Sequence, residues 1–497
     1  MKSIYWIKRF VLYFALIAYV YLWSCRLWFE NSYVSLLIQV PYLLLFIVDI
    51  CVLWSHKKDV RKIMGYYFCK NKLLFLGIAL FVLYDVLTLF YAVTLSYSIN
   101  KYMMFVRTIF LIGSIFLCCY ENDDSIRKKN EENLIRCICF ILIVFVITTI
   151  IRWSLGLSPF LMRISLRMDY NVYAAYFLFA LTFYIFYYMK REESFFGSVK
   201  LIYLIFVIIS CDFIYLSASR RALILCSIVV TISLLFYVVR KTVKYKNSHI
   251  KVWNTRNIKS YVMMVCFVIV LVVNFKYSIP IFEKYISTVS EEKKEAHKNF
   301  MRECLSTGQS NGQTNGQQTV NISETSISKR YESVKSEEGM VSRQNIWKVS
   351  IAGIKEFDLK EIVFGKGNGY SWNIYENDED EEVRELLDLY GMEKSKPQWM
   401  MPHNFILTEF LEGGLLKILL ILFLTIAIIY SLFQYIKTDN VYGCMFLLLY
   451  FCFAANFMLG TTHGLLGEDL FWLTTGLLIL FRSNETMVEK NIFRKKE

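Results

Sequence analysis

The stretch IYLSASRRALIL, residues 214–225, places two adjacent arginines, Arg220 and Arg221, between two long apolar runs. Charged side chains are rare inside such runs, so the pair marks a short loop between two membrane-spanning helices. The side of the membrane on which this loop lies fixes the orientation of the neighbouring segments. It also limits what the two arginines can bind.

The composition predicts an integral membrane protein with an all-helical fold. Of its 497 residues, 56% are hydrophobic and 17% are aromatic, and the apolar residues fall in runs of roughly 20, the length with which a helix crosses a bilayer. The first run begins at Phe10 and lacks a small-residue cleavage site, so we expect it to be retained. About twelve transmembrane helices are predicted, over residues 10–29, 33–54, 73–93, 102–119, 134–153, 170–189, 199–217, 222–239, 260–280, 415–436, 441–459 and 465–482.

The distribution of Lys and Arg predicts the orientation. If the N-terminus is cytoplasmic, the inner segments include strongly basic stretches such as 55–72 and 240–259. An excess of Lys and Arg marks the cytoplasmic side, so both termini are predicted to be inside. The net charge of +13 then reflects orientation, and no nucleic-acid partner is expected. The short outer loops hold five basic residues: Lys101, Arg163, Arg167, Arg220 and Arg221.

One polar segment is too long to be a simple connection between spans. Its centre, about 306–325, is of low complexity. The flank at 342–357 has the apolar spacing of a helix, and the acidic stretch at 377–392 predicts a second one. We expect a small helical cap over the outer membrane face. The predicted organisation is a membrane domain with spans one to nine over 1–282, an extracytoplasmic loop over 283–403, spans ten to twelve over 404–482 and a cytoplasmic tail over 483–497.

No motif for a metal or a cofactor stands out. The 13 cysteines lie mostly in or beside apolar runs and lack metal-ligand spacing, so we interpret them as packing residues without a disulfide framework. The outer segments contain no His/Asp cluster. The acidic run ENDEDEEVRE, residues 376–385, is typical of a solvated helix face. We therefore predict neither a metal nor a cofactor.

The arginines in the predicted outer loops are exceptions to the rule that Lys and Arg gather on the cytoplasmic side. Each of them therefore suggests a local interaction that holds it there. A guanidinium group offers a planar fork of donors that matches phosphate oxygens and stays charged. A set of them at the outer membrane edge suits a lipid-linked phosphate or diphosphate. Alternatively, they extend to lipid headgroups or pair with the acidic loop. Arg220 is the strongest candidate, ahead of Arg221, Arg163 and Arg167.

Two histidines are candidates for a general base. His403 precedes Asn404 where the long loop re-enters the membrane, and His463 lies at the same predicted boundary. An imidazole, whose unperturbed pKa is about 6.5, can accept a proton from a hydroxyl nucleophile. A packing or capping role at a helix start is the alternative for either histidine.

Glycines and intramembrane acids supply further candidates. The stretch KEIVFGKGNGY, residues 360–370, lacks the terminal G-K-[ST] of a P-loop, so a tight turn is favoured. Asp85 and Asp212 lie within apolar runs, where acids are costly and often functional. Asp212 is a candidate neighbour of Arg220, and structural pairing is the alternative for both acids.

Together, these motifs resemble the O-antigen ligase/O-antigen polymerase superfamily of bacterial polytopic membrane glycosyltransferases. The resemblance covers roughly residues 160–435, and Arg221 departs from it because a small residue is commoner at that position. The low-complexity insert is a second departure. The matching positions are DYNVYAAY at 169–176, Ser219-Arg220, Arg343 to Trp347, Phe364 to Gly367, His403-Asn404, Glu412 and Gly414.

The resemblance implies a C-type glycosyltransferase-like fold in the bacterial cytoplasmic membrane and a metal-independent, inverting glycosyl transfer. The donor would be an undecaprenyl-diphosphate-linked oligosaccharide and the acceptor a glycan, with a flippase and a chain-length regulator as candidate partner proteins. Arg220 and Arg343 would bind the diphosphate, assisted by Arg221, Arg163 and Arg167. His403 would be the base, supported by Asn404 and Glu412.

Three functions stay open at this point. The additional outer arginines favour a polymerase, because two lipid-diphosphate substrates would need more cations than one. Transfer of a finished glycan to a lipid, protein or wall acceptor would make the protein a ligase. A polysaccharide transporter or flippase is less favoured, because transporters use helices broken near the midplane. We expect no such break here, since the glycines at 413–414 precede the predicted span.

Overall fold

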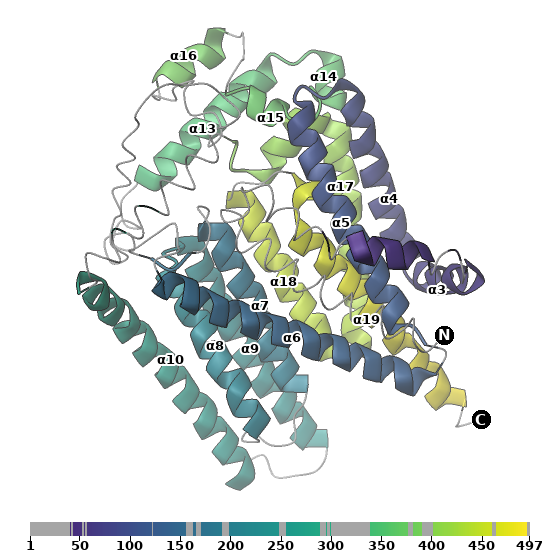
Figure 1. Ribbon diagram of the computed structural model, residues 1–497, viewed down its shortest axis with the longest axis vertical. Helices are drawn as coiled ribbons and strands as arrows, with labels where there is room; N and C mark the ends of the chain where they lie inside the picture. The colour runs from purple at the N-terminus through teal and green to yellow at the C-terminus, as the bar shows by residue number, and fades with distance from the viewer. Residues whose placement is uncertain are drawn as a thin grey trace. The chain divides into compact units, whose positions relative to one another are not determined.

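The computed structural model is all-helical in the residues that it describes (Figure 1). These residues are 57–121, 123–155, 163–165, 170–190, 198–247, 255–288, 338–375, 381–389, 401–459 and 464–494, with positions 40, 43–51, 54, 295 and 299. The predicted span 10–29 and the insert at 306–325 fall outside them, as does half of the span 33–54.

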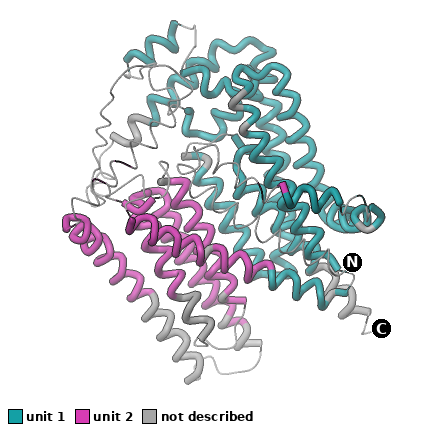
Figure 2. The backbone as a smooth tube through the Cα atoms, in the orientation of Figure 1, with its two compact units in different colours: residues 1–12, 44–133, 336–497 teal, residues 13–43, 134–335 magenta. Residues whose placement is uncertain are grey.

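The chain divides into two compact units, coloured separately in Figure 2. Unit 1 comprises residues 1–12, 44–133 and 336–497, and unit 2 comprises 13–43 and 134–335. Helix α6, Asp124–Ser154, carries the chain from the first unit into the second.

Unit 1 is built around the long helix α17, which packs against α4 and α18, while α5 packs against α19 (Figure 1). Its helices before the loop are α3 (Lys57–Lys70), α4 (Lys72–Leu87), η2 (Thr88–Tyr91) and α5 (Leu95–Cys119). Those after it are α13 (Glu338–Lys355), α14 (Leu359–Phe364), α15 (Tyr370–Asn373), α16 (Glu381–Leu389), α17 (Phe405–Thr438), α18 (Asn440–Leu459), η5 (Leu465–Gly467) and α19 (Asp469–Arg494).

Unit 2 is a bundle in which α7 packs against both α8 and α9, and α10 packs against α8. The ring of Phe177 lies 5.0 Å from that of Phe145 and 4.9 Å from that of Phe213, so aromatic side chains form much of its core. Besides α6, its helices are α7 (Tyr170–Lys190), α8 (Ser198–Leu216), α9 (Arg220–Asn247) and α10 (Thr255–Ser287).

Several helices suggest a multi-pass membrane protein. In the described residues, 5 helical segments are long and apolar enough to cross a bilayer. Large apolar side chains such as Leu235 on α9 and Ile281 on α10 are exposed, as lipid-facing side chains are. The predicted spans from 73–93 onward all coincide with helices. The segments that meet both criteria are Lys72–Tyr91, Lys101–Cys119, Ser125–Ser154, Arg220–Arg240 and Phe405–Thr438.

The two helices predicted in the long loop are confirmed as α13 and α16. Val383 and Leu387 of α16 are buried in a common core with residues of α13, α15 and α17, whereas the acidic face of α16 is exposed. The Tyr375 hydroxyl lies 2.6 Å from Ser350 Oγ of α13. Burial raises the pKa of Tyr375, and the hydrogen bond to Ser350 opposes this shift.

Helix α17 is broken at Gly414, directly before the predicted span 415–436. Gly414 has φ 63° and ψ −164°, a conformation outside the helical region. The helix begins at Phe405, before the predicted span 415–436, so the break falls within the membrane-length segment Phe405–Thr438. The predicted span 415–436 begins directly after the break, so that span itself is unbroken, and the sequence prediction missed only the helical stretch 405–413 that precedes it.

Candidate functional site

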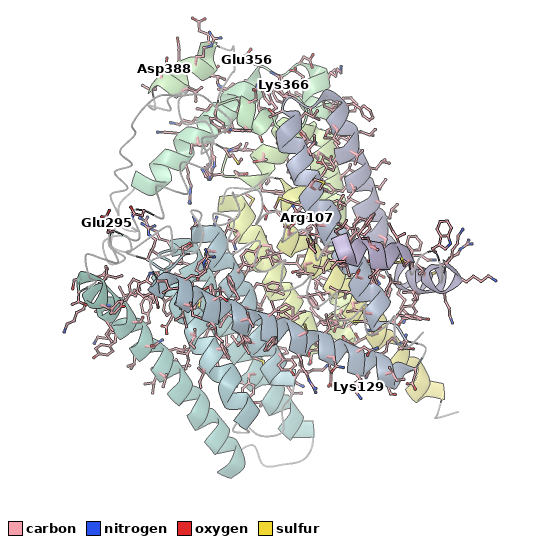
Figure 3. The ribbon with its side chains drawn as sticks, viewed as in Figure 1. Arg107, Lys129, Glu295, Glu356, Lys366 and Asp388 are labelled. Carbon is pink, nitrogen blue, oxygen red and sulfur yellow. The ribbon has the colours of Figure 1, made fainter. Side chains whose placement is uncertain are left out.

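The glycine-rich stretch after α14 forms the tight turn that its sequence predicts. Gly365, Gly367 and Gly369 have φ of 72°, 94° and 87°, values that glycine adopts far more readily than other residues. A side chain at Gly365 would meet the backbone of Glu412 and Gly413. The turn therefore lies directly against the break in α17. Lys366, within the turn, is labelled in Figure 3.

This turn caps the first part of α17, residues 405–413, which we call the half-helix. The backbone N–H of Lys366 donates to the carbonyl of Leu411 at 3.0 Å, and that of Gly367 donates to Glu412 O at 3.0 Å. The hydroxyl of Tyr84 on α4 donates to Gly413 O at 2.8 Å. Carbonyls at the end of a helix lack partners within it. Here the turn and Tyr84 supply those partners.

Five buried ionisable side chains gather beside the break, and we call them the ion cluster: Asp85, Lys101, Glu409, Glu412 and Lys417. Lys417 Nζ lies 2.5 Å from Asp85 Oδ1 and 2.7 Å from Glu409 Oε2. It also lies 3.8 Å from Glu412 Oε2. Lys101 Nζ lies 3.5 Å from Asp85 Oδ1 and 3.4 Å from Glu412 Oε2. No side chain of the cluster is more than 2% exposed.

Neutral donors complete the surroundings of the three carboxylates. Asp85 Oδ2 accepts a 2.6 Å hydrogen bond from the hydroxyl of Tyr102. Glu412 Oε1 accepts from Ser371 Oγ at 2.7 Å and from the N–H of Gly369 at 3.2 Å. Glu409 Oε1 accepts from the N–H of Leu465. Every carboxylate oxygen of the cluster therefore faces a donor, which a buried charge requires.

Asn368 joins the turn to the connection between α4 and α5. Its Oδ1 accepts from Lys101 Nζ at 3.1 Å, and its Nδ2 donates to Thr88 Oγ1 at 2.7 Å. Its backbone carbonyl accepts from the N–H of Val93 at 3.0 Å. The turn, α4, α5 and the half-helix thus share one buried polar network.

The prediction that Lys101 lies in an outer loop was wrong. Helix α5 begins at Leu95, so Lys101 is inside the helix and 2% exposed. Sequence reasoning ended the span at its first charged residue, whereas Lys101 is neutralised by acids from other helices. It also left Lys417 and Glu409 out of the site. A lysine inside the apolar run LLKILL was the available signal for Lys417.

His403 and Asn404 lie at the start of the half-helix. Asn404 is its N-cap, because Asn404 Oδ1 accepts from the N–H groups of Ile406 and Leu407 at 3.0 and 3.2 Å. His403, half-buried, has φ 48°, an uncommon conformation for a residue other than glycine. The capping role thus belongs to Asn404. Backbone strain at the residue before a cap is a feature often found at functional sites.

Two further predicted residues belong to unit 1. Arg343 is half-buried on α13, which packs against α17. The carboxylate of Glu412 contacts Lys101, Lys417, Gly369 and Ser371. These ion pairs and hydrogen bonds give Glu412 a structural role. Its predicted role in supporting His403 stays a prediction.

In unit 2, two predicted outer loops lie together. The N–H of Ile164 donates to the carbonyl of Leu216 at 2.9 Å, which joins the short segment 163–165 to the end of α8. Ser219 Oγ donates to Asn171 Oδ1 of α7 at 2.8 Å and accepts from the N–H of Ala222. Ala218, between α8 and α9, has φ 60°.

These contacts join the backbone segments that carry Arg163, Arg220 and Arg221 at one end of unit 2. Arg163 is buried, and Arg220 and Arg221 are half-buried in the first turn of α9. Asp212 Oδ1 accepts from Asn274 Nδ2 of α10 at 2.6 Å, which is the structural pairing considered for this acid. Arg167 and His463 lie outside the described residues.

Within the described residues, no group of three or more His, Cys, Asp or Glu side chains is placed to hold a metal ion. Neither the protein-family models nor the curated proteins include a match to this chain. The chain is a helical protein with several membrane-length apolar helices.

The contact between the turn and the half-helix gives a first prediction. Gly365→Ala is expected to lower the free energy of unfolding by about 2–3 kcal/mol, because alanine is strained at positive φ and its Cβ would meet the backbone of Glu412 and Gly413. Thermal unfolding in detergent measures the change. Gly65→Ala is the matched control, because no atom lies within 4 Å of the added Cβ in α3. Equal midpoints for the two variants would contradict the described contact.

Proposed function

We propose that this chain is a polytopic membrane glycosyltransferase that polymerises lipid-linked oligosaccharide repeat units into a surface polysaccharide, such as capsule, O-antigen or exopolysaccharide. The observation that carries the proposal is direct contact between motifs that are distant in sequence. Ser219 of SASRR contacts Asn171 of DYNVYAAY in unit 2. In unit 1 the turn FGKG contacts the EGG stretch of α17. Each unit thus brings together motifs of the O-antigen ligase/polymerase resemblance.

The arginine-bearing end of unit 2 supports binding of a lipid diphosphate. Arg163 comes from the segment 163–165 and Arg220 and Arg221 from the first turn of α9, and the backbone hydrogen bond from Ile164 to Leu216 joins that segment to the end of α8. Guanidinium groups at fixed positions can neutralise the charge that develops on a leaving diphosphate. The first turn of a long helix adds its N-terminal dipole to the same end.

The start of α17 in unit 1 supports proton transfer. His403 precedes a capped helix, and Arg343 lies on the helix α13 packed against that helix. In the proposed reaction the acceptor hydroxyl attacks the anomeric carbon and passes its proton to His403. The bond from that carbon to the diphosphate oxygen breaks, and the anomeric configuration inverts. Arg343 assists the leaving diphosphate.

The proposal includes the topology that the sequence predicts. About twelve spans would place both termini in the cytoplasm and the loop 283–403 outside the bacterial cytoplasmic membrane. Undecaprenyl-diphosphate glycan would then be donor and, as a polymerase requires, also acceptor, with a flippase and a chain-length regulator as partner proteins.

Arg220 supplies a direct test of diphosphate binding. Purified protein is incubated in detergent with an undecaprenyl-diphosphate glycan, and release of undecaprenyl diphosphate is measured. Arg220→Lys is expected to lose nearly as much activity as Arg220→Ala, about 10²-fold, because a point charge does not replace a bidentate fork. Near-wild-type release by the lysine variant would reduce the role of Arg220 to charge screening.

The product profile distinguishes a polymerase from a ligase. A deletion strain of a polymerase should show single repeat units on the final acceptor. Full-length chains stranded on the lipid carrier would instead indicate a ligase, which transfers the finished glycan to a lipid, protein or wall acceptor.

A transporter is the second candidate, favoured by one observation. The helix break at Gly414 and the buried ion cluster beside it are features that transporters place at substrate sites. The assay in detergent separates the two candidates. Release of undecaprenyl diphosphate indicates a transferase, whereas glycan binding without release indicates transport.

A further inference from the structure

The half-helix 405–413 is bounded at both ends by capping contacts. At its start, Asn404 accepts from two backbone N–H groups. At its end, the turn and Tyr84 bind its last carbonyls, and Gly414 interrupts the hydrogen-bonded backbone. A helix of this length has little stability of its own in isolation. Its placement therefore depends on side-chain contacts with the elements around it.

Two acidic residues supply those contacts. Glu409 and Glu412 are three positions apart, so they lie on the same face of the half-helix. Glu409 contacts Lys417, which follows the break in α17. Glu412 contacts Lys417 and also Lys101 of α5. The two lysines therefore join the half-helix to the rest of α17 and to α5, and Asp85 of α4 contacts both of them.

Each lysine of the cluster contacts several acceptors. The Lys101 ammonium has three acceptors, on Asp85, Asn368 and Glu412. The Lys417 ammonium also faces three carboxylate oxygens, one each on Asp85, Glu409 and Glu412. An ammonium group has three protons, so hydrogen bonds use all three protons of Lys101, whereas the contacts of Lys417 are ion pairs. Neutral donors satisfy the remaining carboxylate oxygens.

We propose that Lys101 and Lys417 are positioning residues that fix the half-helix and the glycine turn as one block, and thereby fix His403 at its start. The claim that this block controls catalysis by His403 rests on the proposed function. Neither lysine touches the reacting atoms in this scheme. Both act through Glu412, and Lys417 also acts through Glu409. A displacement of about 1 Å in a catalytic group can cost about 10²-fold in rate.

The test removes one positive charge from the ion cluster and then restores the net charge of the cluster by removing one negative charge. Lys101→Met leaves Glu412 with one lysine partner fewer. Lys101→Met/Glu412→Gln removes the matching negative charge, and the Gln amide oxygen still accepts from Gly369 and Ser371. The exposed residue Lys72 at the start of α4 supplies the control, Lys72→Met.

Two readouts are measured on the full-length protein in detergent. Hydrogen exchange of peptides covering 405–413 reports the block itself. It is expected to rise at least about tenfold in Lys101→Met and to return toward the wild-type rate in the double variant. In the undecaprenyl diphosphate release assay, kcat is expected to fall about 10²-fold in the single variant with KM nearly unchanged. The double variant should recover about tenfold.

The outcomes separate the two proposals. Unchanged exchange in Lys101→Met, or no recovery in the double variant, overturns the positioning role. Raised exchange with an unchanged kcat also overturns it, because the block would then not control His403. If the wild-type protein releases no undecaprenyl diphosphate while exchange rises and recovers as expected, the block is supported and the proposed function fails.

Discussion

Lys417→Met is expected to lower the free energy of unfolding by about 3–5 kcal/mol, the largest stability effect that we predict for a single substitution. Lys417 is fully buried and contacts three carboxylates, on Asp85, Glu409 and Glu412. Methionine has a similar length but no charge. Removing the ammonium would leave three buried acids with only Lys101 and neutral donors around them. The cost comes from these uncompensated acids rather than from lost packing.

Thermal unfolding in detergent, followed by circular dichroism, measures this effect. Lys355→Met is the matched control, because Lys355 forms a 3.0 Å ion pair with Glu382 whose side chains are 61% and 48% exposed. An exposed ion pair typically contributes about 0–1 kcal/mol. Lys417→Met/Glu409→Gln should be more stable than Lys417→Met, because one unpaired carboxylate is removed as well. A Lys417→Met protein no less stable than Lys355→Met would contradict the ion cluster.

The helices were predictable because their signal is local. Runs of about 20 apolar residues have few structures open to them in a bilayer other than a helix, and the runs from 73–93 onward coincide with helices. The spacing of Ile346 and Ile354 predicted α13, and the acidic stretch before Leu387 predicted α16. The glycine turn was predicted for a similar reason. Three glycines lie within five residues, at 365, 367 and 369, and glycine readily adopts the positive φ that a tight turn needs.

The ion cluster was not predictable because its members come from distant parts of the chain. Asp85 was recognised as an unusual acid, but nothing near it in sequence identifies Lys417 as its partner. Lys101 follows a stretch of polar residues, and by composition it belongs to a loop. Only the packing of α17 against α4 and the extra turns at the start of α5 bring these side chains together.

The candidate site was predicted in parts. The sequence identified Arg163 and Arg220 separately, and the hydrogen bond between Ile164 and Leu216 joins the segment of Arg163 to the end of α8, four residues before Arg220. Their common place depends on how α7, α8 and α9 pack, which no local pattern specifies. The sequence also singled out Asn404 beside His403, and an Asn before an apolar run is a signal for the N-cap that it forms.

His403→Ala is expected to lower transfer by about 10²–10⁴-fold, the contribution typical of a general base. A sugar hydroxyl is too weak an acid to ionise at neutral pH, so attack on the anomeric carbon requires a group that accepts its proton. The measurement is release of undecaprenyl diphosphate by purified protein, with membrane insertion checked in parallel. Insertion should be intact, because His403 precedes α17 and the cap is made by Asn404.

The backbone of His403 calls for a second substitution in the same experiment. Its φ of 48° is strained for alanine but accessible to asparagine and free for glycine. His403→Asn and His403→Gly therefore remove the imidazole without adding strain, and we expect both to be as inactive as His403→Ala. If either retained wild-type activity, the loss in the alanine variant would come from the backbone and His403 would not be the base. His463→Ala would then test the rival histidine, because loss of transfer in that variant would identify His463, predicted at the same membrane boundary, as the proton acceptor.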